Sequence, residues 1–82
     1  MEYFVYIIRS KKDGSLYTGF TLDLKKRLER HNSAKVVSTK NKVPFEVVYF
    51  EASLSLKEAL RREKYLKSSK AKNLKSSFRN VV

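Results

Sequence analysis

The sequence predicts an α+β fold, a three-stranded and mainly antiparallel sheet flanked by helices, in the order β-β-α-β-α-α. Two apolar segments joined by an Asp-Gly turn predict a hairpin, and a third such segment follows a proline. Leucines and alanines at helical spacing predict the helices. The chain has 82 residues and neither a repeat nor a linker, so we expect one domain over residues 1–82.

The hairpin comes first. Segment 2–10, EYFVYIIRS, is apolar at both alternating sets of positions, which is typical of a strand covered on both faces and therefore central in its sheet. Asp13 and Gly14 form a strong turn signal. Segment 15–20, SLYTGF, then returns antiparallel to the first strand.

The first helix is expected over residues 22–32, LDLKKRLERHN. Thr21 is the predicted N-cap, and Asp23 in the first turn suits the helix dipole. Leu24 and Leu28 define the inner face.

The rest of the chain alternates between loop, strand and helix. Segment 33–42 is polar and basic and is expected to be a loop, and segment 45–52, FEVVYFEA, is the third strand. Ser55 and Glu58 form a capping box that opens the second helix. Its predicted apolar stripe consists of Leu56, Ala59, Leu60 and Leu66, and a short third helix carries Ala71, Leu74 and Phe78.

The chain is strongly basic. Nineteen Lys and Arg against eight Asp and Glu give a formal net charge of +11, which favours polyanionic partners, nucleic acid first. Cysteine is absent, which excludes disulfides and thiolate zinc sites. The longest apolar run, residues 3–8, is too short to cross a bilayer, and no signal-peptide pattern precedes it, so we expect a soluble cytoplasmic protein without a membrane partner.

The predicted hairpin and first helix carry four polar side chains that are candidates for a functional site. Tyr6 and Tyr17 lie on adjacent strands, and Arg27 and His31 share a face of the first helix because they are four residues apart. Each has a structural alternative, since strand tyrosines usually belong to the core or its rim and basic helix residues usually face solvent.

Glu63 departs from the apolar pattern expected on the inner face of the second helix. It lies on the stripe of the second helix that should be apolar, among basic neighbours. The structural alternative is an ion pair with Lys67 four residues later, and Glu51 is another acid that could line a site.

In their order along the chain, these residues resemble the GIY-YIG nuclease superfamily. Segment 4–6, FVY, corresponds to the first motif and segment 17–19, YTG, to the second. The family arginine falls on Arg27, a frequent histidine on His31, and the metal-binding glutamate on Glu63.

The resemblance extends from residue 3 to about residue 78 and is closest to small stand-alone members. Phe4 replaces a motif glycine and Thr18 a motif isoleucine, and the loop after the first helix lacks the glycines usual in that branch. Asn73 is a further candidate for an asparagine found in some members.

The resemblance implies metal-dependent hydrolysis of a phosphodiester, with DNA as the expected substrate and RNA as a possibility. Glu63 would hold Mg²⁺ or Mn²⁺, and Mg²⁺ commonly needs only one or two protein carboxylates. Arg27 would stabilise the transition state. Tyr6 would act as general base, Tyr17 would orient water or phosphate, and His31 would accept or relay the proton of Tyr6.

Several residues are expected to contact nucleic acid. Gly19, within a strand, would let a backbone approach a phosphate, or else mark a simple bulge. The basic residues expected at the phosphate backbone, which are thought to point away from Glu63's face, are Arg61, Arg62 and Lys64, joined by Lys26, Lys67 and Lys70.

Two other functions compete with the nuclease. A catalytically silent nucleic-acid-binding module would bind with a salt-dependent affinity and without a metal. A structural protein, for example one associated with ribosomes, would be indifferent to changes at Tyr6 or Arg27. A protein partner that supplies specificity is a further expectation.

Overall fold

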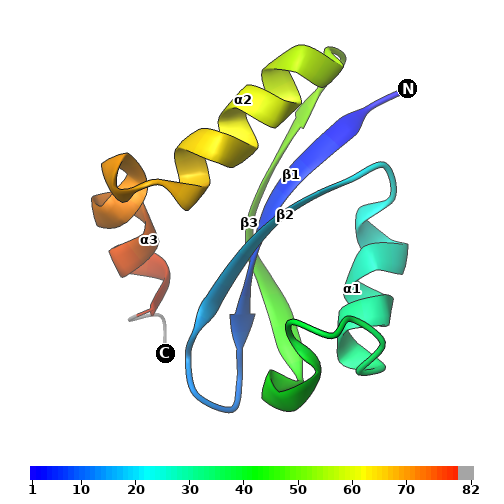
Figure 1. Cartoon of the computed structure of the whole chain (residues 1–82), viewed down its shortest axis with the longest axis vertical. Coiled ribbons are helices and arrows are strands. Elements are labelled where there is room, and N and C mark those ends of the chain that lie inside the picture. Colours follow the sequence, from blue (N-terminus) through cyan, green and yellow to red (C-terminus); the bar gives the residue numbers. More distant parts are fainter. Residues whose placement is uncertain (80–82) are drawn as a thin grey trace.

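The structure is a computed structural model that describes residues 1–79. It confirms the predicted fold class and element order, with two short 3-10 turns in addition (Figure 1). The elements are β1 Tyr3–Ser10, β2 Leu16–Thr21, α1 Leu24–Asn32, η1 Lys40–Lys42, β3 Phe45–Ser53, α2 Leu56–Lys67, η2 Ser69–Ala71 and α3 Lys72–Arg79.

The sheet has the order β2-β1-β3, and both pairs of strands are antiparallel. The hairpin prediction and the central position of the first strand are therefore correct. Across β1, Tyr6 is opposite Gly19 of β2 on one side and Phe50 of β3 on the other. A register shift between Ile7 and Ile8 interrupts only the pairing with β3.

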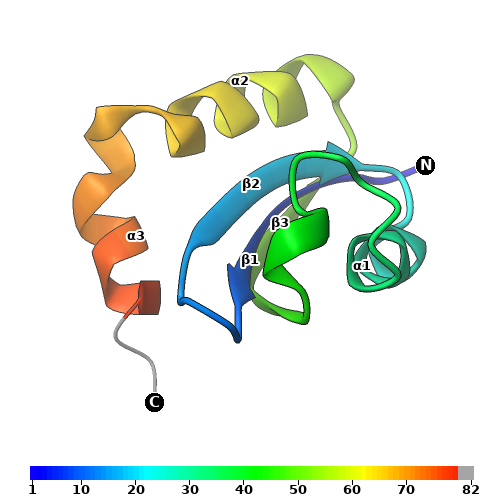
Figure 2. The same ribbon diagram turned by 60° about the horizontal axis from the view of Figure 1, so that its bottom comes forward.

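The two faces of β1 belong to two separate cores. Val5 and Ile7 pack against Ala59 and Leu66 of α2 and, farther on, Ala71. The alternate residues Tyr6 and Ile8 pack with Phe45 and with leucines of α1. Helices α2 and α3 thus cover one face of the sheet and α1 covers the other, as Figure 2 shows.

Helix α1 begins two residues later than predicted. Thr21 still belongs to β2, and Asp23 is the N-cap, with a side-chain oxygen that accepts from Lys26 N at 3.0 Å. The Thr21 hydroxyl instead accepts from Asp23 N at 3.2 Å. Thr21 pairs with Phe4 across the sheet, so its backbone is committed to the strand and cannot open a helix.

The capping box of α2 is only half formed. Ser55 accepts from Glu58 N at 3.2 Å, but Ser55 N donates to Ser53 Oγ at 3.0 Å, and the Glu58 carboxylate pairs with Arg61.

The predicted stripe of α2 is also partly wrong. Ala59 and Leu66 are buried, whereas Leu56 and Leu60 are each 46% exposed. The face that meets the sheet is completed by two charged residues, Arg62 and Glu63, both half-buried.

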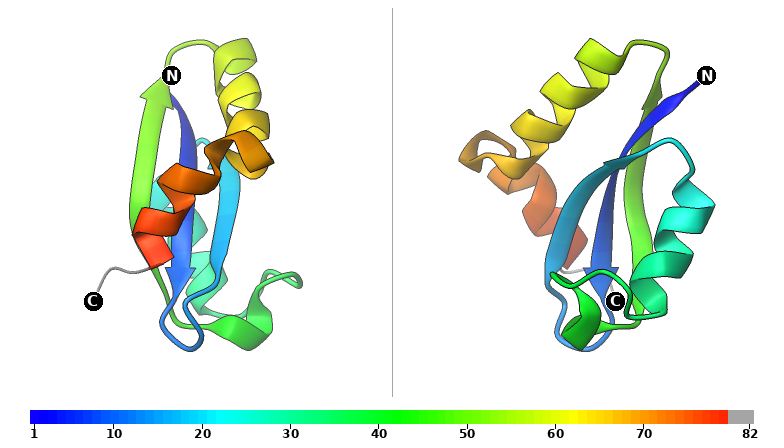
Figure 3. Two further views of the ribbon diagram at one scale, coloured as in Figure 1. Left: turned by 90° about the vertical axis from the view of Figure 1, so that its left-hand side faces the viewer. Right: turned by 45° about the vertical axis from the view of Figure 1, so that its right-hand side comes forward.

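The segment between α1 and β3 is held at both ends. Asn32, the last residue of α1, donates to Phe45 O at 3.1 Å and accepts from Phe45 N at 2.6 Å. Ala34 has a φ of 62°, a left-handed conformation that glycine usually provides after a helix. Turn η1 lies beside the β1–β2 turn (Figure 3), where Ser10 Oγ donates to Lys42 O at 2.6 Å.

Candidate active site

The candidate site is built around the hydroxyl of Tyr6. This side chain extends from the central strand and is only 1% exposed. Its oxygen accepts from Arg27 Nε at 3.2 Å and lies 3.0 Å from His31 Nε2. The structure therefore brings Tyr6, Arg27 and His31 together, as the spacing of the two basic residues on α1 predicted.

Gly19 makes room for this hydroxyl. A Cβ atom added at Gly19 would lie 2.3 Å from Tyr6 Oη and 2.5 Å from Tyr6 Cζ, too close for any side chain. The register between β1 and β2 runs without interruption through Gly19, so the bulge alternative is wrong. The close approach that requires glycine is that of the Tyr6 ring, and the approach of a phosphate stays a prediction.

His31 is fully buried behind Tyr6. Its Nδ1 lies 2.8 Å from Thr39 Oγ1, and that hydroxyl lies 3.5 Å from Val36 O, to which it can donate. We assign the tautomer from these contacts: Nδ1–H donates to Thr39, which leaves Nε2 to accept the proton of Tyr6. Burial, with the charges of Arg27 and Arg30, lowers the pKa of His31 to about 4, so the ring is neutral at pH 7.

The phenol of Tyr6 keeps its proton in this state. Burial raises its pKa above the usual 10.0, the hydrogen bond and charge of Arg27 oppose this, and Tyr17 and Glu63 add to the increase. Because the pKa of His31 is lowered and that of Tyr6 is raised, the resting pair is a neutral imidazole and a protonated phenol. The role of His31 as acceptor of the Tyr6 proton stays a prediction, and its contacts with Tyr6 and Thr39 also suit a residue that positions the phenol.

Tyr17 contacts the same cluster from the edge strand. Its ring is 5.2 Å from that of His31, centroid to centroid, in an edge-on arrangement. Unlike Tyr6, it is only half-buried. Tyr17 also lines a cavity of about 250 Å³ with Leu16, Thr18, Lys67 and Lys75. Tyr17 is thus the tyrosine of this cluster that borders open space.

Glu63 approaches from the other face of the sheet. Its side chain is 20% exposed, and its carboxylate forms the expected ion pair with Lys67 at 3.0 Å. The charge of Glu63 is among the causes that raise the pKa of Tyr6, which puts the two groups within electrostatic range. Tyr6 and the helix that carries Glu63 therefore lie on opposite faces of the sheet.

The donor set fits a divalent cation held mainly by water and substrate. Within residues 1–79, no group of three or more His, Cys, Asp or Glu side chains converges on a possible metal position. Among the residues proposed for the site, Glu63 is the one that carries a carboxylate, the oxygen ligand that Mg²⁺ or Mn²⁺ prefers. One carboxylate is a sufficient protein contribution for Mg²⁺. Lys67 would have to release Glu63 for the ion to bind.

Arg62 does not point away from the inner face. It donates to Glu51 through Nε at 2.8 Å and Nη2 at 3.0 Å, and its guanidinium lies 5.0 Å from the centre of the Tyr65 ring. Glu51 also accepts from Tyr49 at 2.7 Å. The expectation that Arg62 points elsewhere is wrong, because Arg62 pairs with Glu51 across α2 and β3.

The other basic residues lie on exposed surfaces. Arg61, Lys64 and Lys70 line one outward-facing depression with Tyr65 and Ser68. Lys26 lies on the outer side of α1, in a shallow depression that it shares with Arg30 and Lys35.

Two supporting residues escaped the sequence analysis. Thr39, 2% exposed, holds the far side of His31, and Asn32 fixes the segment that carries Thr39. The only available signal was an asparagine at the end of a predicted helix, and nothing in the polar segment 33–42 distinguishes Thr39 from its neighbours.

The fold is that of a GIY-YIG domain, the catalytic domain of a nuclease family. The family model described as the GIY-YIG catalytic domain matches residues 2–76, and the chain belongs to the GIY-YIG family. A UPF0213 protein of Staphylococcus saprophyticus is 41% identical over 76 residues, which are 90% of this chain and 92% of that protein. A UPF0213 protein of Streptococcus agalactiae is 40% identical over 65 residues, 78% of this chain and 73% of that protein.

A solved structure agrees with the fold. The solution NMR structure of a UPF0213 protein from Bacillus halodurans has a TM-score of 0.57 and 39% sequence identity, over 94% of this chain and 84% of that one. The resemblance to the stand-alone GIY-YIG branch is thereby confirmed. Within residues 1–79, no helix is long and apolar enough to cross a membrane.

Proposed function

We propose that the chain hydrolyses phosphodiester bonds in nucleic acid, with DNA as the first substrate class, in a metal-dependent reaction. The observation that carries the proposal is the 3.2 Å contact between Arg27 Nε and Tyr6 Oη. The Tyr6 hydroxyl lies so close to Gly19 that no side chain fits at position 19. A buried phenol that accepts from a guanidinium is an arrangement suited to proton chemistry next to a negatively charged substrate. The net charge of +11 supports a polyanionic substrate.

Arg27 is the proposed electrostatic catalyst. Its hydrogen bond to Tyr6 raises its own pKa, so it stays charged at any working pH. One guanidinium edge is occupied by Tyr6, and the remaining N–H groups can stabilise the charge that develops on the phosphate.

Tyr6 is the proposed general base, and Tyr17 the residue that orients water or phosphate. Because the pKa of Tyr6 is raised, the reactive phenolate is a minor form at neutral pH, and Arg27 is the neighbour that favours it. Glu63 would hold the divalent ion, which when bound polarises the phosphate and stabilises the leaving oxygen.

The assignment of Tyr6 as general base predicts how the cleavage rate depends on pH. We expect log(kcat/KM) to rise by about one per pH unit from pH 7 to pH 9, because the fraction of Tyr6 phenolate rises tenfold per unit below its pKa. A plateau already reached at pH 7.5 would assign the base to another group.

The function is tested by a cleavage assay on single-stranded, duplex and branched DNA with Mg²⁺ or Mn²⁺. Glu63→Gln should abolish cutting and leave DNA binding intact. The matched control is Glu58→Gln. Like Glu63, Glu58 lies on α2 and pairs with a basic residue, in its case Arg61, but it is on the exposed side of the helix. Equal rates for wild type and Glu63→Gln would contradict the proposal.

The second candidate is a binding module without turnover. It is favoured by two observations: Tyr6 is 1% exposed, and Glu63 is already paired with Lys67. It predicts salt-dependent binding that is unchanged by Mg²⁺ and by Glu63→Gln, with no cleavage of any DNA form. If the isolated chain binds every DNA form without cutting, adding a lysate fraction tests whether a protein partner supplies specificity.

A further inference from the structure

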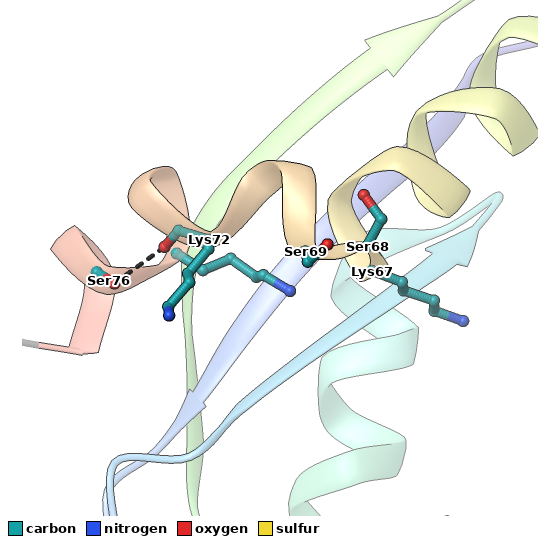
Figure 4. A pocket seen from close by; sticks show the side chains of 6 residues that line it. Lys67, Ser68, Ser69, Lys72 and Ser76 are labelled. Carbon is teal, nitrogen blue, oxygen red and sulfur yellow. Dashed lines mark hydrogen bonds between the residues drawn. The ribbon is translucent and has the colours of Figure 1, made fainter.

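A groove lined by lysines and serines runs from the end of α2 to the start of α3. Lys67, Ser68, Ser69, Lys72, Lys75 and Ser76 line a cavity of about 280 Å³ there. Figure 4 shows that its labelled side chains come from the end of α2, from the turn that follows, and from α3. The cavity holds far more than one water molecule, which occupies about 30 Å³ in the liquid.

This groove is continuous with the candidate active site. Lys67 and Lys75 line both this cavity and the one beside Tyr17. Lys67 is also the residue that pairs with Glu63. One lysine therefore contacts the proposed metal ligand and both cavities.

The chemistry of the groove is that of an anion site. Its lining offers three ammonium groups and three hydroxyls and contains no carboxylate. Within residues 1–79, neither Lys72 nor Lys75 forms an ion pair, and Lys75 is half-buried despite its charge. Lysine ammonium groups and hydroxyls are common partners of phosphate oxygens in nucleic acids.

The outward face of α2 is different. Arg61 is neutralised by Glu58, and the depression that it shares with Lys64 and Lys70 includes the ring of Tyr65. Charge alone would draw a nucleic acid to either surface, but only the groove leads to Tyr17.

We propose that the groove of Lys67, Lys72 and Lys75 binds the phosphate backbone of a nucleic-acid strand on one side of the phosphodiester at Tyr17. The inference rests on the proposed function, since it places the strand relative to that reaction centre. When the strand and a metal bind, Lys67 moves from Glu63 to a phosphate, so substrate binding frees the carboxylate.

The test compares two pairs of substitutions with the same change in charge. The groove pair is Lys72→Gln with Lys75→Gln. The control pair is Lys25→Gln with Lys57→Gln, two exposed lysines that form no ion pair within residues 1–79. Binding of a fluorescein-labelled 20-nucleotide DNA, as a single strand and as a duplex, is measured from 50 to 200 mM salt with EDTA, so that no cutting occurs.

We expect the groove pair to weaken binding roughly tenfold and to lower the slope of log K against log salt by about two, since each phosphate contact contributes nearly one. The control pair should weaken binding less than about threefold. Equal effects of the two pairs would overturn the groove but not the nuclease. If the wild type neither binds DNA in this assay nor cuts it in the cleavage assay, the proposed function is wrong, and so is the strand-binding role of the groove.

A second measurement does not depend on the folding of the double variants. The sequence contains no cysteine, so Ser69→Cys introduces a single thiol into the groove. It should form a mixed disulfide, by exchange that releases the leaving thiol, with an oligonucleotide that carries an activated disulfide tether on its backbone. Ser55→Cys, at the other end of α2, should not. Equal cross-linking at the two positions would contradict the proposed strand path.

Discussion

Replacing Gly19 with alanine tests the centre of the site. The new methyl group would lie 2.3 Å from Tyr6 Oη and 2.9 Å from Tyr6 Cε1, and the Tyr6 ring is too buried to swing aside freely. Either the strands separate locally or the ring moves. In the second case the hydroxyl leaves both Arg27 and His31.

The magnitude follows from these two effects. Overpacking of a buried position typically costs about 1–3 kcal/mol. Loss of the hydroxyl contacts adds about 1–3 kcal/mol, because one donor is charged. Alanine restricts the unfolded chain and returns about 0.4–1 kcal/mol. We therefore expect Gly19→Ala to lower the free energy of unfolding by about 1–5 kcal/mol.

The assay is urea unfolding followed by circular dichroism, on wild type, Gly19→Ala, Tyr6→Phe and the double variant. Tyr6→Phe removes the hydroxyl but keeps Cζ, which would still lie 2.5 Å from the methyl group. The steric part should therefore persist in the double variant while the hydrogen-bond part vanishes. A coupling free energy of about 1–3 kcal/mol is the expected result.

The other glycine of the chain is the control. Gly14 has a φ of 77° and its added Cβ would meet nothing closer than Arg9 Nη2 at 4.0 Å. Gly14→Ala should cost about 1–2 kcal/mol through backbone strain alone, equally with and without Tyr6→Phe. If Gly19→Ala lowers the free energy of unfolding by less than about 0.5 kcal/mol, or shows no coupling to Tyr6→Phe, the steric argument is refuted.

Three further predictions concern stability. Burial and two arginines of α1 lower the pKa of His31 to about 4, below its ordinary 6.5, so its contribution is present above pH 6.5 and lost as the pH falls towards 4. The stability difference between wild type and His31→Gln should shrink by about 1–3 kcal/mol from pH 7 to pH 4, and a constant difference in urea unfolding would contradict the buried neutral ring. Ala34→Gly should raise the free energy of unfolding by about 0.5–1 kcal/mol, because φ is 62° there, and no change in the urea midpoint would show that the strain is negligible. Arg62→Met should lower the free energy of unfolding by about 1–2 kcal/mol, because it leaves the Glu51 carboxylate unpaired. Adding Glu51→Gln should recover part of this loss, and a double variant less stable than Arg62→Met would show that the unpaired carboxylate is not the reason.

The sequence was sufficient for the element order because each element carries its own pattern. The continuous apolar run of β1 and the turn at Gly14 depend only on near neighbours. Helix spacing also predicted that Arg27 and His31 would lie on one face. These features needed no knowledge of the rest of the chain.

The errors arose where distant segments decide. The helical spacing of α2 predicted that Leu56 and Leu60 face the sheet. In the structure, the residues of this helix that pack on the sheet are Ala59 and Leu66. Thr39 became part of the site only because the segment after α1 folds back over His31. A pattern along one helix cannot report what lies across from it.

The buried charges of α2 were recognised only in part. Glu63 was singled out because it interrupts an apolar stripe, and its half-buried position agrees with that reasoning. Arg62, its neighbour, was taken for a surface residue because its partner, Glu51, lies in β3. Ion pairs between distant elements leave no mark in either segment alone.

The central position of β1 has a consequence for hydrogen exchange. Among the strands of the sheet, β1 alone is paired on both sides, and it also lies between the two cores. Its amides should exchange only through global unfolding, whereas those of segment 33–42 open locally. We therefore expect Tyr6 to lie in the slowest-exchanging part of the sheet, and Thr39, on the far side of His31, to lie in a faster-exchanging segment. Opening of that segment can therefore admit water to the His31 side of the site without disturbing the strand that presents the phenol.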